Sequence, residues 1–181
     1  VESRNYGTRK HVLQYDDVMN KQREVIYSQR RSVLEGKDLR QSIIEMIGSL
    51  VRDAVNPYTA IGEHPEEWDI NGLLDYFEHI FLPKGFIKLS EDQIYDLTRD
   101  GLIKLIEDAA VRLYEAREKQ IAEAGFDMRE IERVILLRVV DQKWMDHIDN
   151  MDQLRQGVGL RAYGQRDPII EYRIEGFDMF D

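Results

Sequence analysis

No cysteine occurs among the 181 residues, and proline occurs only four times. The absence of cysteine excludes disulfide bonds, thiolate metal sites and thiol catalysis. No apolar run approaches the roughly 18 residues that a membrane-spanning helix requires, and no secretory signal pattern opens the chain. Because the chain begins with Val1 rather than Met and still looks helical at Asp181, we expect a fragment of a longer protein.

Motifs of nucleotide-binding and hydrolytic enzymes are also missing. The sequence has no G-x-x-x-x-G-K-[ST] phosphate loop, no G-x-G-x-x-G after a predicted strand and no H-E-x-x-H motif. The four histidines are scattered, and neither Ser3 nor Ser90 has the surroundings of a nucleophile. We therefore expect this chain to be no enzyme by itself, with no catalytic residue, no metal site and no cofactor of its own.

Charge is unevenly distributed along the chain. The formal net charge is −10, which argues against a general nucleic-acid binder, because such proteins neutralise phosphates with Lys and Arg. The middle segment, residues 56–120, is the acidic one, with 7 Lys/Arg against 14 Asp/Glu. We expect no nucleic-acid partner.

Helical periodicity dominates residues 1–55, where apolar side chains recur three, four or seven positions apart. They are Val12, Tyr15, Met19, Ile26 and Val33, followed by Leu39, Ile43, Ile47, Leu50 and Ala54. The pattern predicts one very long helix, or two nearly collinear helices with a defect at Gly36 and a cap at Asp38. Some fifty helical residues would extend about 75 Å, which indicates a strut. No segment alternates with period two, so the predicted fold class is all-α.

Residues 56–120 are predicted to form a small helical insertion with its own modest core. Pro57, Pro65 and Pro83 punctuate the segment. A short amphipathic helix is expected after Asn71, and Ser90 with a glutamine three residues later has the spacing of a capping box. A further helix carries the apolar residues between 97 and 113.

Residues 121–181 are predicted to form an antiparallel hairpin of two helices, with the second helix cut short. Asp127 marks the start of the first helix. Its 3- and 4-residue apolar spacing persists for more than six turns, until Gly157 and Gly159 end it. Asp167 followed by proline starts the second helix.

The connecting loop, RQGVGLRAYGQR at residues 155–166, has three arginines, three glycines and no acidic residue. One reading is an ordinary connector, with Tyr163 packed against its own helices. The other is an interaction tip, in which Tyr163 makes sequence-tolerant contacts and the cations meet carbonyl or phosphate oxygens. The residues alone leave both readings open.

An acidic cluster with one histidine occupies 141–152, and a divalent-metal site there is the weaker of two readings. Its members are Asp141, Asp146, His147, Asp149 and Asp152. On a helix, however, Asp146, Asp149 and Asp152 drift around the axis instead of converging. We therefore interpret the cluster as a solvated face opposite the apolar stripe of Trp144, Ile148 and Met151.

Two long stretches carry a family resemblance. VESRNYGTRKHVLQYDDVMNKQREVIYSQR at 1–30 and VDQKWMDHIDNMDQLRQGVGLRAYGQRDPIIEYRIEGFDMF at 140–180 resemble the parts of SecA on either side of its helical wing. Residues 56–120 match less recognisably, beyond the tryptophan of EEWDINGL. The resemblance implies a first scaffold helix at 1–55, a helical wing domain at 56–120, and a continued scaffold with a two-helix finger at 121–181.

The resemblance also implies a role for the loop. Tyr163 corresponds to the family's fingertip tyrosine, which is thought to touch the translocating polypeptide, and polypeptide or channel contact is implied for neighbouring residues as well. These are Leu160, Arg161, Gln165 and Arg166, with Gly157, Gly159 and Gly164 as hinge glycines of the finger. Gly159 departs from the larger residue, often histidine, expected at that position, which predicts a more mobile loop.

Cofactors and partners follow from the same resemblance. The family hydrolyses ATP with magnesium in motor domains that this chain lacks, so neither is expected to bind here. The implied partners are the nucleotide-binding and preprotein-binding domains of the same protein, the SecY channel and unfolded preprotein. The implied location is the cytoplasm, peripherally at the cytoplasmic membrane, and the isolated fragment is expected to be prone to self-association. A purely structural helical adaptor is the alternative.

Overall fold

The computed structural model describes residues 2–36, 39–60, 62, 64–161 and 167–180. These residues form helices and connecting turns without any strand, so the predicted all-α fold is confirmed. The chain divides into two compact units: unit 1 comprises residues 1–37 and 131–181, and unit 2 comprises residues 38–130. Over the part of the chain that is described, no helix has the length and apolar composition to cross a membrane.

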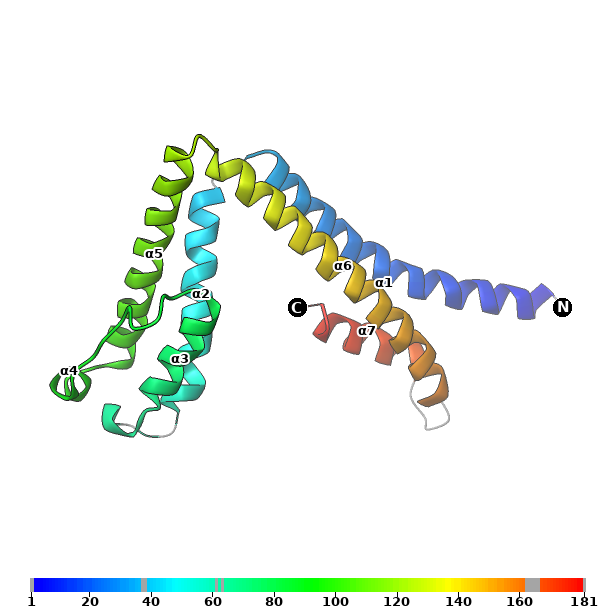
Figure 1. Cartoon of the computed structure of the whole chain (residues 1–181). Coiled ribbons are helices and arrows are strands. Elements are labelled where there is room, and N and C mark those ends of the chain that lie inside the picture. The colour runs from blue at the N-terminus through cyan, green and yellow to red at the C-terminus, as the bar shows by residue number, and fades with distance from the viewer. Residues whose placement is uncertain (1, 37–38, 61, 63, 162–166, 181) are drawn as a thin grey trace. The chain divides into compact units, whose positions relative to one another are not determined.

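Two long helices and one short helix make up unit 1. They are α1 (Glu2–Leu34), α6 (Met128–Arg161) and α7 (Pro168–Asp178). Helices α1 and α6 run antiparallel, as their cross-contacts require: Arg133 Nε donates to the Val33 carbonyl at 3.4 Å, whereas Arg30 pairs with Asp141 at 3.0 Å. Helix α7 folds back along the C-terminal half of α6 (Figure 1).

A left-handed glycine ends α1. Gly36 has φ +69°, a conformation that glycine adopts without steric cost and that commonly terminates helices. The next helix, α2 (Leu39–Thr59), belongs to unit 2. Of the two predicted arrangements, the structure therefore has two helices with a break at Gly36. The predicted cap, Asp38, lies outside the described residues.

Unit 2 is built around α2 and a long antiparallel partner, α5 (Arg99–Glu123), with α3 (Ile70–Ile80) packed alongside (Figure 1). The 3₁₀ turn η1 (Pro65–Glu67) and the short helix α4 (Glu91–Tyr95) complete it. The buried core consists of Val51, Val55, Leu73, Phe77, Leu82, Leu102, Ile106 and Ala109. This core includes Val51 and Val55 from before residue 56, so it belongs to unit 2, and a separate helical insertion at 56–120 stays a prediction.

Local capping signals predicted the starts of α4, α6 and α7 but not that of α5, which Thr98 caps. Ser90 and Gln93 form the reciprocal capping box, and Asp127 Oδ1 accepts from the Arg129 N–H at 2.9 Å. The start after Asn71 was wrong, because Asp69 caps α3 through the Gly72 N–H at 2.9 Å and the helix begins at Ile70.

The predicted segment boundaries do not coincide with the division into two units. The boundary between 55 and 56 falls inside α2, which continues through Pro57 to Thr59, and that between 120 and 121 falls inside α5. Along the sequence, the division between the two units falls at 37/38 and 130/131. The buried face of α2 is also shifted by one residue, to Gly48, Val51 and Val55, while Leu50 is 38% exposed.

Candidate functional site

The candidate site is the hairpin formed by α6 and α7 together with its seat on α1. Of the predicted contact residues, Leu160 and Arg161 form the last helical residues of α6. Tyr163, Gln165 and Arg166, and the hinge glycine Gly164, lie outside the described residues.

Helix α6 continues through Gly157 and Gly159, so the prediction that these glycines end it was wrong. Each glycine in a helix interior costs about 1 kcal/mol relative to alanine. Burial on the same turns offsets that cost, because Val158 is 1% exposed and Leu154 is 8% exposed in the core of unit 1. A role for the two glycines as hinges stays a prediction.

An apolar core joins the hairpin to α1. It contains Val18 from α1, Tyr172 from α7, and three residues from the C-terminal half of α6 that recur at helical spacing: Met151, Leu154 and Val158. Helix α7 starts as predicted, with Asp167 Oδ1 accepting from the Ile169 N–H at 3.0 Å. The hairpin therefore packs against a helix from the other end of the sequence.

Aromatic and cationic groups cover one side of this core. The rings of Tyr15 and Tyr172 meet edge to face at 4.8 Å, and the Arg155 guanidinium lies 4.9 Å from the Tyr15 ring. Arg155 also lies 3.9 Å from Asp16. Burial raises the pKa of the Tyr172 hydroxyl. Arg155, which was predicted to open the basic loop, is instead a helical residue that packs against α1.

A buried polar group sits deeper in the unit, where α1, α6 and α7 meet. Gln22 Nε2 donates to the Gly176 carbonyl at 2.9 Å, and Gln22 Oε1 lies 2.8 Å from His147 Nε2. Gln22 and His147 are 7% and 8% exposed. Buried amides and imidazoles are costly unless they are hydrogen-bonded, and here each satisfies the other.

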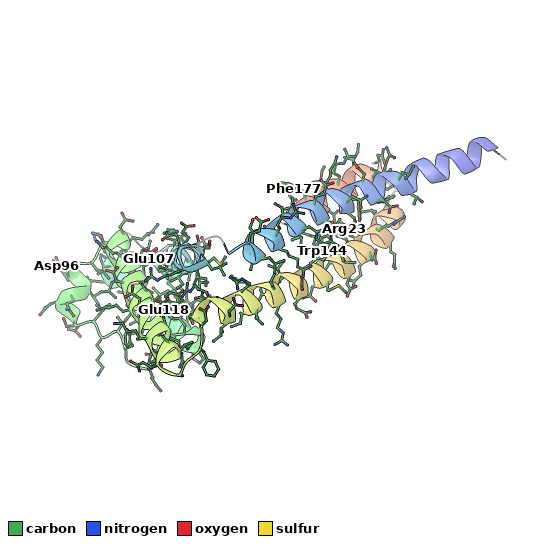
Figure 2. The ribbon with its side chains drawn as sticks, turned by 90° about the horizontal axis from the view of Figure 1, so that it is seen from above. Arg23, Asp96, Glu107, Glu118, Trp144 and Phe177 are labelled. Atoms are coloured by element: carbon green, nitrogen blue, oxygen red, sulfur yellow. The ribbon has the colours of Figure 1, made fainter. Side chains whose placement is uncertain are left out.

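Aromatic rings enclose His147. Trp144 stacks on it with ring centroids 5.7 Å apart, and Phe180 lies 5.2 Å away. Trp144 is on the side of α6 that faces α1 (Figure 2). Desolvation by these surroundings lowers the pKa of His147 below its ordinary value. The prediction that His147 belongs to a solvated face was therefore wrong.

The acidic cluster does not converge. Asp141 pairs with Arg30, and Asp146 Oδ1 accepts from the Gln142 amide at 2.9 Å. Among the residues that the structure describes, no group of three or more His, Asp or Glu side chains is arranged to hold a metal ion. Asp141 thus pairs across to α1, whereas Asp146 pairs within α6.

A separate hollow of about 510 Å³ lies in unit 2. Its walls are mostly apolar and come from α2, α5 and the turn after α3, with Arg117 and Gln120 as polar members. Arg117 Nη1 donates to Gln120 Oε1 at 3.3 Å.

Gln22 and Gly176 were not singled out from the sequence. A signal for Gln22 existed, because it lies three positions after Met19 and four before Ile26, on the apolar stripe of α1. A polar residue on an otherwise apolar stripe calls for a buried partner. That partner, however, is more than 100 positions away in the sequence, and only the fold identifies it.

Long antiparallel helices, a small helical unit with its own core and a polar centre with no converging catalytic groups among the described residues define a helical scaffold module. All 181 residues match the family model described as the SecA Wing and Scaffold domain. The chain belongs to this family.

Named relatives agree with the family match. "Protein translocase subunit SecA" from Pelotomaculum thermopropionicum is 55% identical over 181 residues, covering 99% of this chain and 20% of the relative. The protein of the same name from Acetivibrio thermocellus is 51% identical over 181 residues, again with 20% of its length covered. The chain thus spans about a fifth of the length of the relatives it matches.

Proposed function

We propose that this chain is the non-catalytic scaffold, wing and finger segment of a SecA-like, ATP-driven protein translocase. In this proposal it couples motion of the motor domains to movement of unfolded preprotein into the SecY channel, and it restrains ATP hydrolysis. The observation that carries the proposal is the α6–α7 hairpin seated on α1, in a chain that matches this family over its whole length. ATP and magnesium are assigned to domains outside this chain.

Exposed apolar side chains support docking to other domains of the same protein. Helix α7 presents Ile170, Ile174 and Phe177 at helical spacing, each more than half exposed, and Phe177 is labelled in Figure 2. Apolar stripes of this kind are typical of interaction surfaces. We assign the nucleotide-binding and preprotein-binding domains as the partners of this face. The isolated fragment should then self-associate, and sedimentation tests that expectation.

The fingertip role belongs to Tyr163, flanked by Leu160, Arg161, Gln165 and Arg166. A Tyr163→Cys substitution in the full-length protein introduces a thiol into a segment that has none. During translocation we expect this thiol to crosslink to a stalled preprotein and to the channel. Tyr95→Cys, at an exposed tyrosine of unit 2, is the matched control. A thiol at position 163 that reaches neither partner would overturn the fingertip role.

The purely structural adaptor makes the opposite prediction for side-chain truncation. If the chain only docks partner domains, Tyr163→Ala leaves transport unchanged. The finger proposal predicts impaired transport with helix content intact by circular dichroism, while Tyr95→Ala transports normally. Separating cells into cytoplasmic and membrane fractions tests the proposed location of the full-length protein, in the cytoplasm and peripherally at the membrane.

A further inference from the structure

Gln22 forms hydrogen bonds that link α1 to both α6 and α7. It projects from α1 and is almost fully buried. The NH₂ group of its amide donates to the carbonyl of Gly176 on α7, and the amide oxygen faces His147 on α6.

The hydrogen bonds determine the orientation of the amide. A backbone carbonyl oxygen only accepts, so the NH₂ group of Gln22 must face Gly176. Its oxygen therefore faces His147 Nε2 at 2.8 Å, and that nitrogen must carry a hydrogen. A hydrogen on His147 Nε2 and the carbonyl of Gly176 thus favour the same orientation of the Gln22 amide.

The acceptor on α7 is a carbonyl near the end of a helix. The last four carbonyls of an α-helix have no partner N–H within it, and the Phe180 N–H donates to Phe177 rather than to Gly176. A side chain at position 176 would also be crowded, because a Cβ there would lie 2.5 Å from Met151 Cε. The glycine thus lets the α7 backbone lie close to Met151 of α6, where the Gln22 amide of α1 reaches its carbonyl.

We propose that Gln22 is a positioning residue that latches the C-terminal end of α7 onto α1, and that His147 sets the latch by orienting the Gln22 amide. The inference rests on the proposed function in one respect, that α7 is the second helix of the finger. The latch then determines how firmly the finger is seated on the scaffold helix.

Amide hydrogen exchange on the 181-residue chain tests the latch directly. Gln22→Leu keeps the size of the side chain and removes both polar groups, which leaves the Gly176 carbonyl unsatisfied. We expect exchange in residues 172–178 to accelerate about tenfold or more, with residues 99–123 of unit 2 unchanged. Gln29→Leu, an exposed glutamine of α1, is the matched control and should leave α7 unchanged.

The role of His147 is tested by a double-mutant cycle. His147→Leu should accelerate exchange at 172–176, and in the Gln22→Leu background it should add less than about twofold, because its effect passes through Gln22. His147→Gln retains an N–H donor and should restore slow exchange. Independent, multiplying effects of the two Leu variants, or a His147→Gln variant that behaves like His147→Leu, would overturn the proposal.

A second variant covers the case in which Gln22→Leu does not fold. Gln22→Met keeps the length and flexibility of the side chain but loses the donor to Gly176, so α7 should again exchange faster. Wild-type exchange in Gln22→Met would refute the latch. These results are independent of transport: a failed Tyr163 crosslink with an intact exchange pattern overturns the finger role alone, and the reverse pattern overturns the latch alone.

Discussion

Histidine 147 illustrates how burial changes the chemistry of one side chain. It lies between aromatic rings with a neutral amide as its hydrogen-bond partner, so a positive charge there is poorly solvated. The lowered pKa means that the unfolded chain binds a proton more readily than the folded chain does. Folding and protonation of this residue therefore oppose each other.

We predict that unit 1 loses stability on mild acidification. The contribution of His147 is fully present above pH 6.5, the ordinary pKa of histidine. It is lost as the pH falls through the lowered pKa of the folded state. Urea unfolding followed by Trp144 fluorescence at pH 7.5 and about 5.5 should show a larger decrease in midpoint for the wild type than for His147→Gln. Equal decreases would contradict the prediction.

At the scale of the element, helix α6 shows packing outweighing intrinsic propensity. Gly157 and Gly159 look like terminators in the sequence, yet the helix continues to Arg161. A Cβ at either glycine would meet nothing within 4 Å. The reason is long-range: Leu154 and Val158 pack into the core that α1 and α7 complete.

Alanine at these glycines is therefore expected to stabilise α6. Gly157→Ala and Gly159→Ala should each raise the free energy of unfolding of unit 1 by up to about 1 kcal/mol, as measured by urea denaturation. Gly36→Ala is the contrasting control within unit 1, because the φ of +69° at Gly36 disfavours a side chain. Loss of stability in both helix variants would show that the helix does not persist at these positions.

The same variants bear on the hinge proposal. If Gly157 and Gly159 serve as hinges of the finger, stiffening them should slow transport by the full-length protein even as stability rises. Unchanged transport would leave Gly164, beyond the described residues, as the remaining glycine of that proposal.

At the scale of the whole molecule, each unit has its own apolar core. The core residues of unit 2 all lie between 51 and 109, whereas the core of unit 1 packs residue 18 against residues beyond 150. Charge is divided as well: unit 2 carries ten Lys/Arg against twenty Asp/Glu, and unit 1 carries fifteen of each. The whole net charge of −10 thus resides in unit 2.

Separate cores predict separate unfolding transitions. Phe77 is fully buried in unit 2, and Phe77→Ala should cost that unit about 3–5 kcal/mol. The two tryptophans report on the units individually, because Trp68 belongs to unit 2 and Trp144 to unit 1. When Phe77→Ala is combined with Trp144→Phe, the fluorescence of Trp68 should report unfolding of unit 2 at a lower urea concentration. When Phe77→Ala is combined with Trp68→Phe, the urea midpoint reported by Trp144 should not change. A coupled shift of both signals would contradict independent folding.

The sequence by itself determined the helical class, several helix starts and the family likeness. Caps such as Ser90–Gln93 and Asp167 act over two or three residues, so their residue types and spacing reveal them without a fold. The likeness at 1–30 and 140–180 is equally local, because it depends on the order of residues alone.

Only the tertiary structure decided which polar residues are buried and where the units divide. Gln22 forms hydrogen bonds with partners 125 and 154 positions away, and no local sequence pattern predicts them. The same holds for Gly157 and Gly159, whose helix persists because of neighbours on other elements. Hydrogen-bond satisfaction and burial are properties of contacts between distant segments, whereas capping and periodicity are properties of adjacent residues.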